Sequence, residues 1–535
     1  MIRRYTASAD NTIVSAYQMN LQTRGTGANA GMADILETFS IYGRVTTSSQ
    51  ELSRILVKFP VAKIRKDRLA GKIPASGSVN FYLNLYNAPS SKTVPRNYKI
   101  LVRAVTRDWE EGDGLDLEGY KDLTYSKYGS NWIRASEAAA WTSVGGDYRN
   151  KPQRVQQFVG GTGNLKVKVT KFVEDWIKNI TGSKFIPNYG FGIHLSGGTP
   201  AAGATSPSYE ASSSAKYVRR DSNVILNPKG AEKSYYTKRF FARGSQYFFF
   251  RPNIEARWNS TKADDRGNFF FSSSRAPASE NLNTLYFYNI VRGKLVDLPG
   301  GGLGPGTTGK LVVSLFSGSK DNTIPSGSGV TRTPLTLDGG KIFATASHVS
   351  TGIYSCNVCL LSSSVKTVYD VWFSGSDDIG NPNKAKQYFT GSFKPLIIGG
   401  GESTSVPSYY LSLTNLKPKY LKNDTARLNL FVRKKNWSPT IYTVASSKIE
   451  SETIISASYK VYRILDGYPA IPYGTGSDYH TGLSYDISGN YFDLDMKLLE
   501  PGYAYGIRFA FYDERNVAWN EQPETFKFRV EDYEY

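Results

Sequence analysis

The sequence predicts an all-β protein built from several domains, and three observations support this prediction. The chain has 535 residues, too many for one compact core, so two to four domains are expected. It contains 37 Tyr, 27 Phe, 50 Gly and 24 Pro. Aromatic residues suit a pleated, half-buried sheet surface, and Gly and Pro supply turns. Short apolar or alternating runs also recur along the whole chain between loops rich in Gly, Ser and Pro.

Residues 1–262 are predicted to form one large β-sandwich. Its expected strands are SRILVKF (53–59), VNFYLNLY (79–86), KILVRAVTRDW (99–109), LKVKVT (165–170) and FGIHLSG (191–197). One segment, VTKFVEDWIKNI (169–180), favours a short amphipathic helix instead, because Phe172, Val173, Trp176, Ile177 and Ile180 recur at helical spacing. We expect this helix to close one end of the sandwich.

The rest of the chain is predicted to hold a connector and two smaller β domains. The connector spans 263–307, carries a strand or two, and ends in a Gly-rich linker. A second β domain is expected over 308–398, a Gly/Ser linker over 399–408, and a third β domain over 409–535.

Cysteine content and hydropathy suggest where the chain folds. Cys356 and Cys359 are its two cysteines, and a secreted β protein of this size often carries several disulfides, so folding in a reducing cytoplasm is expected. Residues 1–14 hold no apolar stretch suited to a signal peptide, and no run approaches 18 apolar residues. In a strand, residues three apart face opposite sides, so the two cysteines are predicted to be separate buried or half-buried thiols.

The net charge of +19 is concentrated in the N-terminal half. Residues 1–262 hold 38 Lys and Arg against 20 Asp and Glu, or +18; residues 263–405 hold 12 against 10, and residues 406–535 hold 15 against 16. The first domain should therefore attract an acidic protein, nucleic acid or an acidic polysaccharide. The alternative is a solvated basic face that only aids solubility.

The densest basic run identifies candidate docking residues. These are Lys63, Arg65, Lys66, Arg68 and Lys72. No aromatic side chain is interleaved with them, which favours docking by charge over recognition of nucleic-acid bases. A solvated turn is the alternative interpretation.

An acidic run in the same domain holds candidate metal ligands. Asp108, Glu110, Glu111 and Asp113 could supply oxygen ligands to Ca²⁺, or a carboxylate pair for glycosidic cleavage. Their spacing does not match the D-x-[DN]-x-[DN]-G calcium loop, so a solvated loop is the alternative.

Other motifs do not predict catalysis or a cofactor. Residues 304–310 match most of a phosphate-binding loop, but Leu311 stands where that loop needs Ser or Thr, and a strand rather than a helix is expected to follow. His194, His348 and His480 lie far apart and outside any nucleophile motif. We expect a non-enzymatic protein without a cofactor.

The first domain resembles the DNRLRE family, a large jelly-roll-like β-sandwich found in secreted bacterial proteins and phage structural proteins. The segments that carry the resemblance are ADNTIV (9–14), SRILVKFPVAKI (53–64), SVNFYLNLY (78–86), WEEG (109–112), GGDY (145–148), VTKFVEDWIKN (169–179), NYGFGIHL (188–195) and FFARGSQYFFFRPNIEARW (240–258). The hexapeptide that names the family is absent. Some members bind acidic polysaccharides, which would suit the basic charge, but no ligand residue can be carried over.

The two C-terminal domains resemble immunoglobulin-like folds. Gly352-Ile-Tyr354-Ser-Cys356 is similar to the "G.Y.C" strand of an immunoglobulin domain, although no partner cysteine for an inter-sheet disulfide is present. Leu499-Glu-Pro-Gly-Tyr-Ala-Tyr505 resembles the tyrosine corner of fibronectin type III domains.

Together the domains resemble virion proteins of contractile-tailed phages of marine bacteria. This resemblance implies a structural protein of the neck, tail, baseplate or capsid surface, made in the host cytoplasm and docked through its basic domain. Partners would be other virion proteins and copies of the chain in a symmetric array. A carbohydrate-binding adhesin for an acidic polysaccharide is the main alternative, and an enzyme using the acidic loop is the third.

Overall fold

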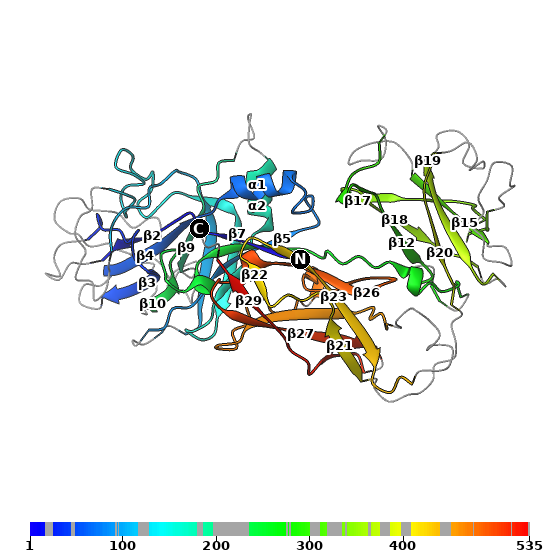
Figure 1. Cartoon of the computed structure of the whole chain (residues 1–535). Coiled ribbons are helices and arrows are strands. Elements are labelled where there is room, and N and C mark those ends of the chain that lie inside the picture. The colour runs from blue at the N-terminus through cyan, green and yellow to red at the C-terminus, as the bar shows by residue number, and fades with distance from the viewer. Residues whose placement is uncertain are drawn as a thin grey trace. The chain divides into compact units, whose positions relative to one another are not determined.

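The computed structural model divides the chain into two units, Met1–Asn259 and Ser260–Tyr535 (Figure 1). Each unit is described by itself. The structure describes all residues except 17–24, 44–48, 91–93, 95, 116–127, 179–185, 196–234, 274–275, 278–279, 300–310, 318–333, 338–339, 362–364, 375–385, 397–407, 439–450, 475, 515 and 533–535. Almost all of the near phosphate loop and both Gly-rich linkers therefore lie outside the described residues.

Unit 1 is a sandwich of two antiparallel sheets, as the all-β prediction requires. The smaller sheet runs β1 Ile2–Thr6, β11 Asn253–Arg257, β5 Asn80–Leu85 and β8 Leu165–Lys168. The larger runs β10 Tyr235–Phe241, β3 Ile35–Gly43, β4 Ser49–Lys58, β9 Phe191–Leu195, β6 Tyr98–Val105 and β7 Tyr148–Phe158, with β2 Ala9–Ser15 also paired to β4. A 3-10 turn, η2, covers Phe248–Phe250.

The core of unit 1 lies between these sheets because strand alternation sends one row of apolar side chains inward from each. Helix α2, Thr170–Lys178, lies against this core as predicted for residues 169–180. Its Phe172 and Trp176 rings make edge contacts with Phe191 of β9 at centroid distances of 5.4 and 5.0 Å. Such aromatic pairs each contribute about 0.5–1.5 kcal/mol beyond burial of their area.

Unit 1 contains two helices, whereas the sequence predicted one in this domain. Helix α1, Val61–Leu69, follows Pro60 and contains the basic run. It buries only Val61 and Ile64, and two apolar residues are too few to show a helical pattern. The helix packs beside α2 (Figure 1), so tertiary contacts rather than periodicity stabilise it.

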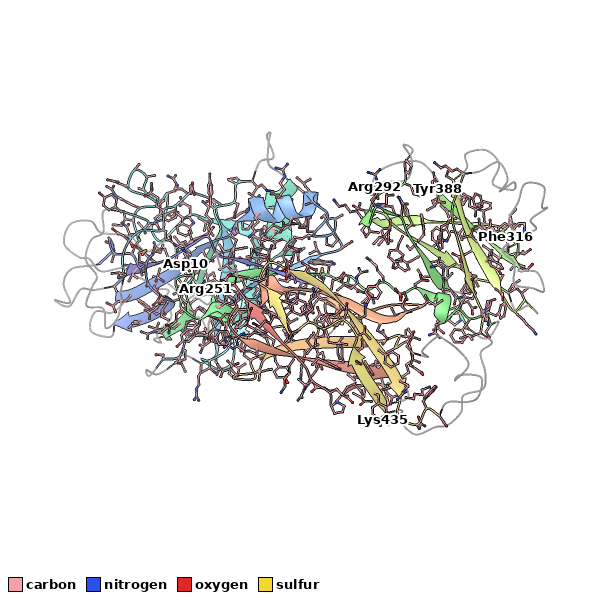
Figure 2. The ribbon with its side chains drawn as sticks, in the orientation of Figure 1. Asp10, Arg251, Arg292, Phe316, Tyr388 and Lys435 are labelled. Carbon is pink, nitrogen blue, oxygen red and sulfur yellow. The ribbon has the colours of Figure 1, made fainter. Side chains whose placement is uncertain are left out.

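The middle part of unit 2 is a sandwich of two antiparallel sheets. One sheet runs β12 Asn283–Tyr288, β18 Ile353–Val358 and β17 Ser347–Ser350; the other runs β16 Ala344–Thr345, β15 Leu311–Ser317, β19 Val368–Ser374 and β20 Lys386–Phe393. Strands β13 Ile290–Val291 and β14 Lys294–Leu295 form a small hairpin with Arg292 at its turn (Figure 2). Cys356 and Cys359 are both buried thiols that form no disulfide, as predicted.

Part of the segment expected as a connector belongs to this sandwich. Phe269 and Phe271 lie in its core, and β12 pairs with β18 along its whole length. Arg266, in the 3-10 turn η3 Asp265–Gly267, reaches Asp370 of β19 with 2.5 Å between Nη2 and Oδ2. Strand β12 alternates buried and half-buried residues, so one of its faces joins the core of the sandwich.

The C-terminal sandwich packs one four-stranded sheet against one five-stranded sheet. The first runs β21 Tyr409–Leu413, β23 Thr425–Lys434, β26 Gly489–Asp495 and β25 Ser484–Asp486; the second runs β22 Lys419–Leu421, β29 Phe526–Glu531, β27 Ala504–Asp513 and β24 Ala457–Arg463, with β28 Ala518–Glu521 paired to β27. Two 3-10 turns, η4 Gly476–Asp478 and η5 Met496–Leu498, complete it.

The tyrosine corner predicted in this domain is present. The buried Tyr505 hydroxyl donates to the Glu500 carbonyl at 2.8 Å and accepts from the Glu500 N–H at 2.9 Å. Both bonds fasten the start of β27 to the preceding loop. Within the described residues, no helix is both long and apolar enough to cross a membrane.

Candidate functional site

Four of the five predicted docking residues are exposed on helix α1 or in the turn that follows it. Lys63, Arg65 and Lys66 lie on the exposed side of α1, and Lys72 is exposed in the turn that follows. No carboxylate among the described residues forms an ion pair with any of them. These four cations are therefore available to an outside partner. Lys63, Arg65 and Lys66 lie on a helix rather than in the solvated turn that was the alternative, whereas Lys72 lies in a turn.

Arg68, the fifth docking candidate, has a partner within the chain. Its guanidinium binds Glu174 of α2 through two bonds, Nη1–Oε2 at 2.8 Å and Nη2–Oε1 at 2.6 Å. Although burial opposes its ionisation, Glu174 has a pKa below the ordinary value because Arg68 binds both carboxylate oxygens. A half-buried bidentate pair of this kind holds two elements together. Arg68 fastens α1 to α2 and is removed from the docking set.

Helix α2 adds two exposed cations to those of α1. Lys171 and Lys178 lie at its two ends on the exposed side. The basic helical face is defined here as Lys63, Arg65, Lys66, Lys72, Lys171 and Lys178. Leu69 lies among the cations of α1 and is 77% exposed. A large apolar side chain so exposed amid positive charge can anchor a protein partner whose acidic rim pairs with the lysines.

The acidic loop does not gather its carboxylates around one point. Asp108 pairs with Lys58, with 2.9 Å between Oδ1 and Nζ, and Glu110 accepts the backbone N–H of Glu137. Glu111 binds an arginine described below, and Asp113 is exposed. No three His, Cys, Asp or Glu side chains in the described part of the chain are arranged to hold a metal ion. The structure thus gives the calcium and glycosidase hypotheses no geometric support.

Buried Asp10 and the half-buried Glu111 and Arg243 form a cluster that sequence reasoning did not identify. Arg243 binds Glu111 through Nε–Oε1 at 2.6 Å and Nη2–Oε2 at 2.5 Å, while its backbone N–H donates to Asp10 Oδ2 at 2.6 Å. The Asp10 N–H also donates to Glu111 at 2.7 Å. Burial raises the Asp10 pKa to about 7. The cluster ties β2, the acidic loop and the chain after β10 together.

These three residues come from three segments on which the DNRLRE resemblance rests. Other quoted segments also meet: Arg54 donates to the Gly145 carbonyl at 2.7 Å, and the Trp109 indole N–H donates to the Tyr189 carbonyl at 2.7 Å. The quoted residues therefore serve structural contacts within one sandwich. The cluster could have been suspected from the sequence, because two of the segments that carry the resemblance hold an acidic residue and a third holds an arginine.

Comparison with known proteins identifies no family. No family model matches the chain, and no curated protein matches it. Among solved structures, a chimeric titin Z1Z2 tandem matches at 12% identity over 42% of this chain and 85% of its own, with a TM-score of 0.14. A DUF4785 family protein from Legionella pneumophila matches at 8% identity over 98% of this chain and 92% of its own, with a TM-score of 0.13. Salmonella alpha-2-macroglobulin matches at 10% identity over 93% of this chain and 28% of its own, with a TM-score of 0.14.

Proposed function

We propose that this chain is a non-enzymatic structural protein of a tailed-phage particle that docks on an acidic protein through its basic helical face. One observation carries the proposal: the exposed cations of α1 and α2 have no ion-pair partner among the described residues, although each unit pairs many of its other charges internally. Unpaired like charges on adjacent helices repel one another, so an acidic partner would stabilise this surface.

The chemistry of the basic helical face favours a protein over a polymer of sugars or nucleotides. It offers no aromatic ring on which a base or sugar could stack, and it exposes Leu69 among its cations. Interfaces between proteins place an apolar anchor at the centre and charged pairs at the rim. The position of the chain in the particle, whether neck, tail, baseplate or capsid surface, and its symmetric repetition follow from the family resemblance alone.

The test is incorporation of the full chain into particles assembled by the virus that encodes it. Purified particles are analysed by mass spectrometry after infection of cells that supply either the wild-type chain or a charge-reversed variant. The variant carries Lys63→Glu, Arg65→Glu and Lys66→Glu. We expect the wild-type chain to co-purify with particles and the variant to be lost from them.

A matched control reverses three exposed lysines elsewhere on unit 1. It carries Lys99→Glu, Lys151→Glu and Lys168→Glu, which change the net charge by a similar amount. The control chain should enter particles like the wild type. Absence of the wild-type chain from particles would refute the structural assignment, and normal entry of the α1 variant would refute the docking surface.

The adhesin alternative predicts a different result from the same variants. If the basic domain binds an acidic polysaccharide, the full chain should be retarded by alginate in a salt-sensitive manner, and reversal of the α1 charges should abolish this. Retardation by alginate together with absence from particles would favour the adhesin.

A further inference from the structure

The C-terminal sandwich carries a cluster of aromatic rings on the outer face of its five-stranded sheet. Strand alternation places Tyr462 of β24, Tyr512 of β27 and Trp519 of β28 on this face, since Tyr459, Ile507 and Phe509 fill the core side. Tyr473 and Tyr479 reach the same face from the loop that follows β24. The aromatic platform is defined here as Tyr462, Tyr473, Tyr479, Tyr512 and Trp519.

Two rings of the platform lie so close to a glycine that a side chain at the glycine position would collide with the ring. A Cβ at Gly482 would stand 2.1 Å from the Tyr479 ring, and a Cβ at Gly506 would stand 2.7 Å from the Tyr462 ring. Tyr479 itself has a φ of 33°, a left-handed conformation that bulky residues rarely adopt. The local chain thus holds these two rings close to the sheet, and both residues remain partly exposed.

Trp519 is the most accessible member of the platform. Its side chain is 43% exposed, and its ring lies 5.4 Å from Tyr512 and 6.2 Å from Tyr479 between centroids. The partly exposed rings of Tyr479 and Tyr512 thus lie beside the exposed ring of Trp519.

A charged triad lies among these rings. Glu521 accepts from Lys460, from Arg508 at 2.9 Å and from the Tyr473 hydroxyl at 3.1 Å. Lys460 lies over the Tyr473 ring at 5.2 Å, and Arg508 lies over Tyr462 at 5.6 Å. The side chains of the triad keep between a quarter and about two fifths of their surface exposed, so they remain hydrated in the free protein.

We propose that the aromatic platform binds a pyranose polysaccharide. The C–H faces of sugar rings pack on Tyr479, Tyr512 and Trp519, while sugar hydroxyls replace water on the triad. A hydroxyl both donates and accepts hydrogen bonds, so it can satisfy Glu521 and Arg508 alike without leaving either charge unpaired. The two cations and one carboxylate nearly balance, which suits an uncharged polysaccharide.

Two other ligand classes fit this surface less well. A protein interface is depleted of charge at its centre, and a dry contact would have to desolvate Lys460, Glu521 and Arg508. A nucleic acid is attracted mainly through its phosphates, yet residues 406–535 hold 15 Lys and Arg against 16 Asp and Glu. The absence of a basic excess here contrasts with the basic helical face on unit 1 and makes this site independent of the proposed docking function.

Affinity electrophoresis of the full chain tests the proposal. Migration is compared in native gels without polymer and with dextran, mannan, arabinogalactan or alginate, alginate being the acidic arm. We expect at least one of the three uncharged polysaccharides to retard the chain. We further expect Trp519→Ala and Tyr479→Ser each to weaken that retardation by about ten-fold or more, the loss typical of an aromatic anchor.

Controls separate binding from folding. Trp437→Ala alters a half-exposed tryptophan of the same domain outside the platform and should leave retardation unchanged, as should Lys63→Glu on α1. Trp519→Tyr should retain most of the binding, and thermal unfolding should show that the two weakened variants remain folded. Failure of all three uncharged polymers to retard the chain would overturn the proposal. Equal retardation of wild type, Trp519→Ala and Tyr479→Ser would overturn it too.

Discussion

Replacing the buried Arg266 with Met should strongly destabilise the middle sandwich. The Arg266 side chain is 10% exposed and binds two carboxylates, Asp264 with 6% and Asp370 with 0% of their side-chain surface exposed. It also donates to the Tyr286 carbonyl at 2.6 Å. Removing the guanidinium leaves both carboxylates buried and facing each other. Breaking a buried pair in this way costs about 3–5 kcal/mol.

Hydrogen–deuterium exchange resolved by peptide measures this loss locally. A decrease of about 3–5 kcal/mol in opening free energy corresponds to exchange faster by about two to three and a half orders of magnitude. This acceleration is expected in peptides from β12 and β19, because Arg266 reaches both strands. Peptides from β4 in unit 1 serve as the internal reference and should exchange at the wild-type rate.

A double variant distinguishes charge burial from lost packing. Asp370→Asn retains an oxygen that can accept the Trp372 indole N–H, which donates to Asp370 at 2.7 Å in the wild type. Combined with Arg266→Met, it removes one of the stranded charges, so the double variant should lose less stability than Arg266→Met alone. The reasoning is wrong if hydrogen–deuterium exchange of β19 peptides in Arg266→Met stays within ten-fold of the wild-type rate. It is also wrong if the losses of stability in the two single variants simply add in the double variant.

Three further predictions concern other buried polar groups. Burial raises the Asp10 pKa to about 7, so between about pH 4 and 7 the native state keeps a proton that an unfolded Asp has released. The free energy of unfolding should therefore fall as pH rises through this window. Asp10→Asn should flatten this pH dependence, measured by urea unfolding at pH 5, 6, 7 and 8. Tyr505→Phe removes both bonds to Glu500 and should cost about 1–3 kcal/mol in thermal unfolding. Arg68→Leu leaves Glu174 unpaired and should cost about 3 kcal/mol, whereas Lys63→Leu should change stability by less than about 0.5 kcal/mol.

Each of these predictions has a result that would contradict it. An unchanged pH dependence in Asp10→Asn would mean that another group controls stability in that window. A Tyr505→Phe chain with wild-type stability would show that the corner bonds contribute nothing net. Equal effects of Arg68→Leu and Lys63→Leu would mean that the α1–α2 ion pair is no stronger than an exposed charge.

Local patterns in the sequence were sufficient for several parts of the fold. Helix α2 was predictable because Phe172, Val173, Trp176 and Ile177 repeat at helical spacing and pack on one side. The tyrosine corner at Tyr505 was predictable because its residues lie within seven positions, so the hydrogen bond to Glu500 depends on local geometry. The all-β class followed from composition and alternation, which reflect the environment of each strand.

Features that depend on distant contacts were not predictable. Helix α1 has too little apolar pattern to be recognised, and its docking to α2 depends on a contact between Arg68 and Glu174, which are 106 positions apart. The same distance in sequence explains why Arg68 was grouped with the docking residues. Phe269 and β12 looked like a connector because their partners, strands β18 and β19, come much later in the chain.

The sequence by itself determined that this is a β-rich chain whose positive charge is concentrated in its first half, because composition and strand alternation are local properties. Only the tertiary structure decided which of those charges remain unpaired. In the folded chain Arg68 pairs with Glu174, and Arg243 pairs with Glu111. Lys63, Arg65 and Lys66 lie on the exposed side of α1. Tyr479, Tyr512 and Trp519 lie together on one sheet face. Pairing and clustering depend on which distant segments the folded core brings together, and no local pattern encodes that.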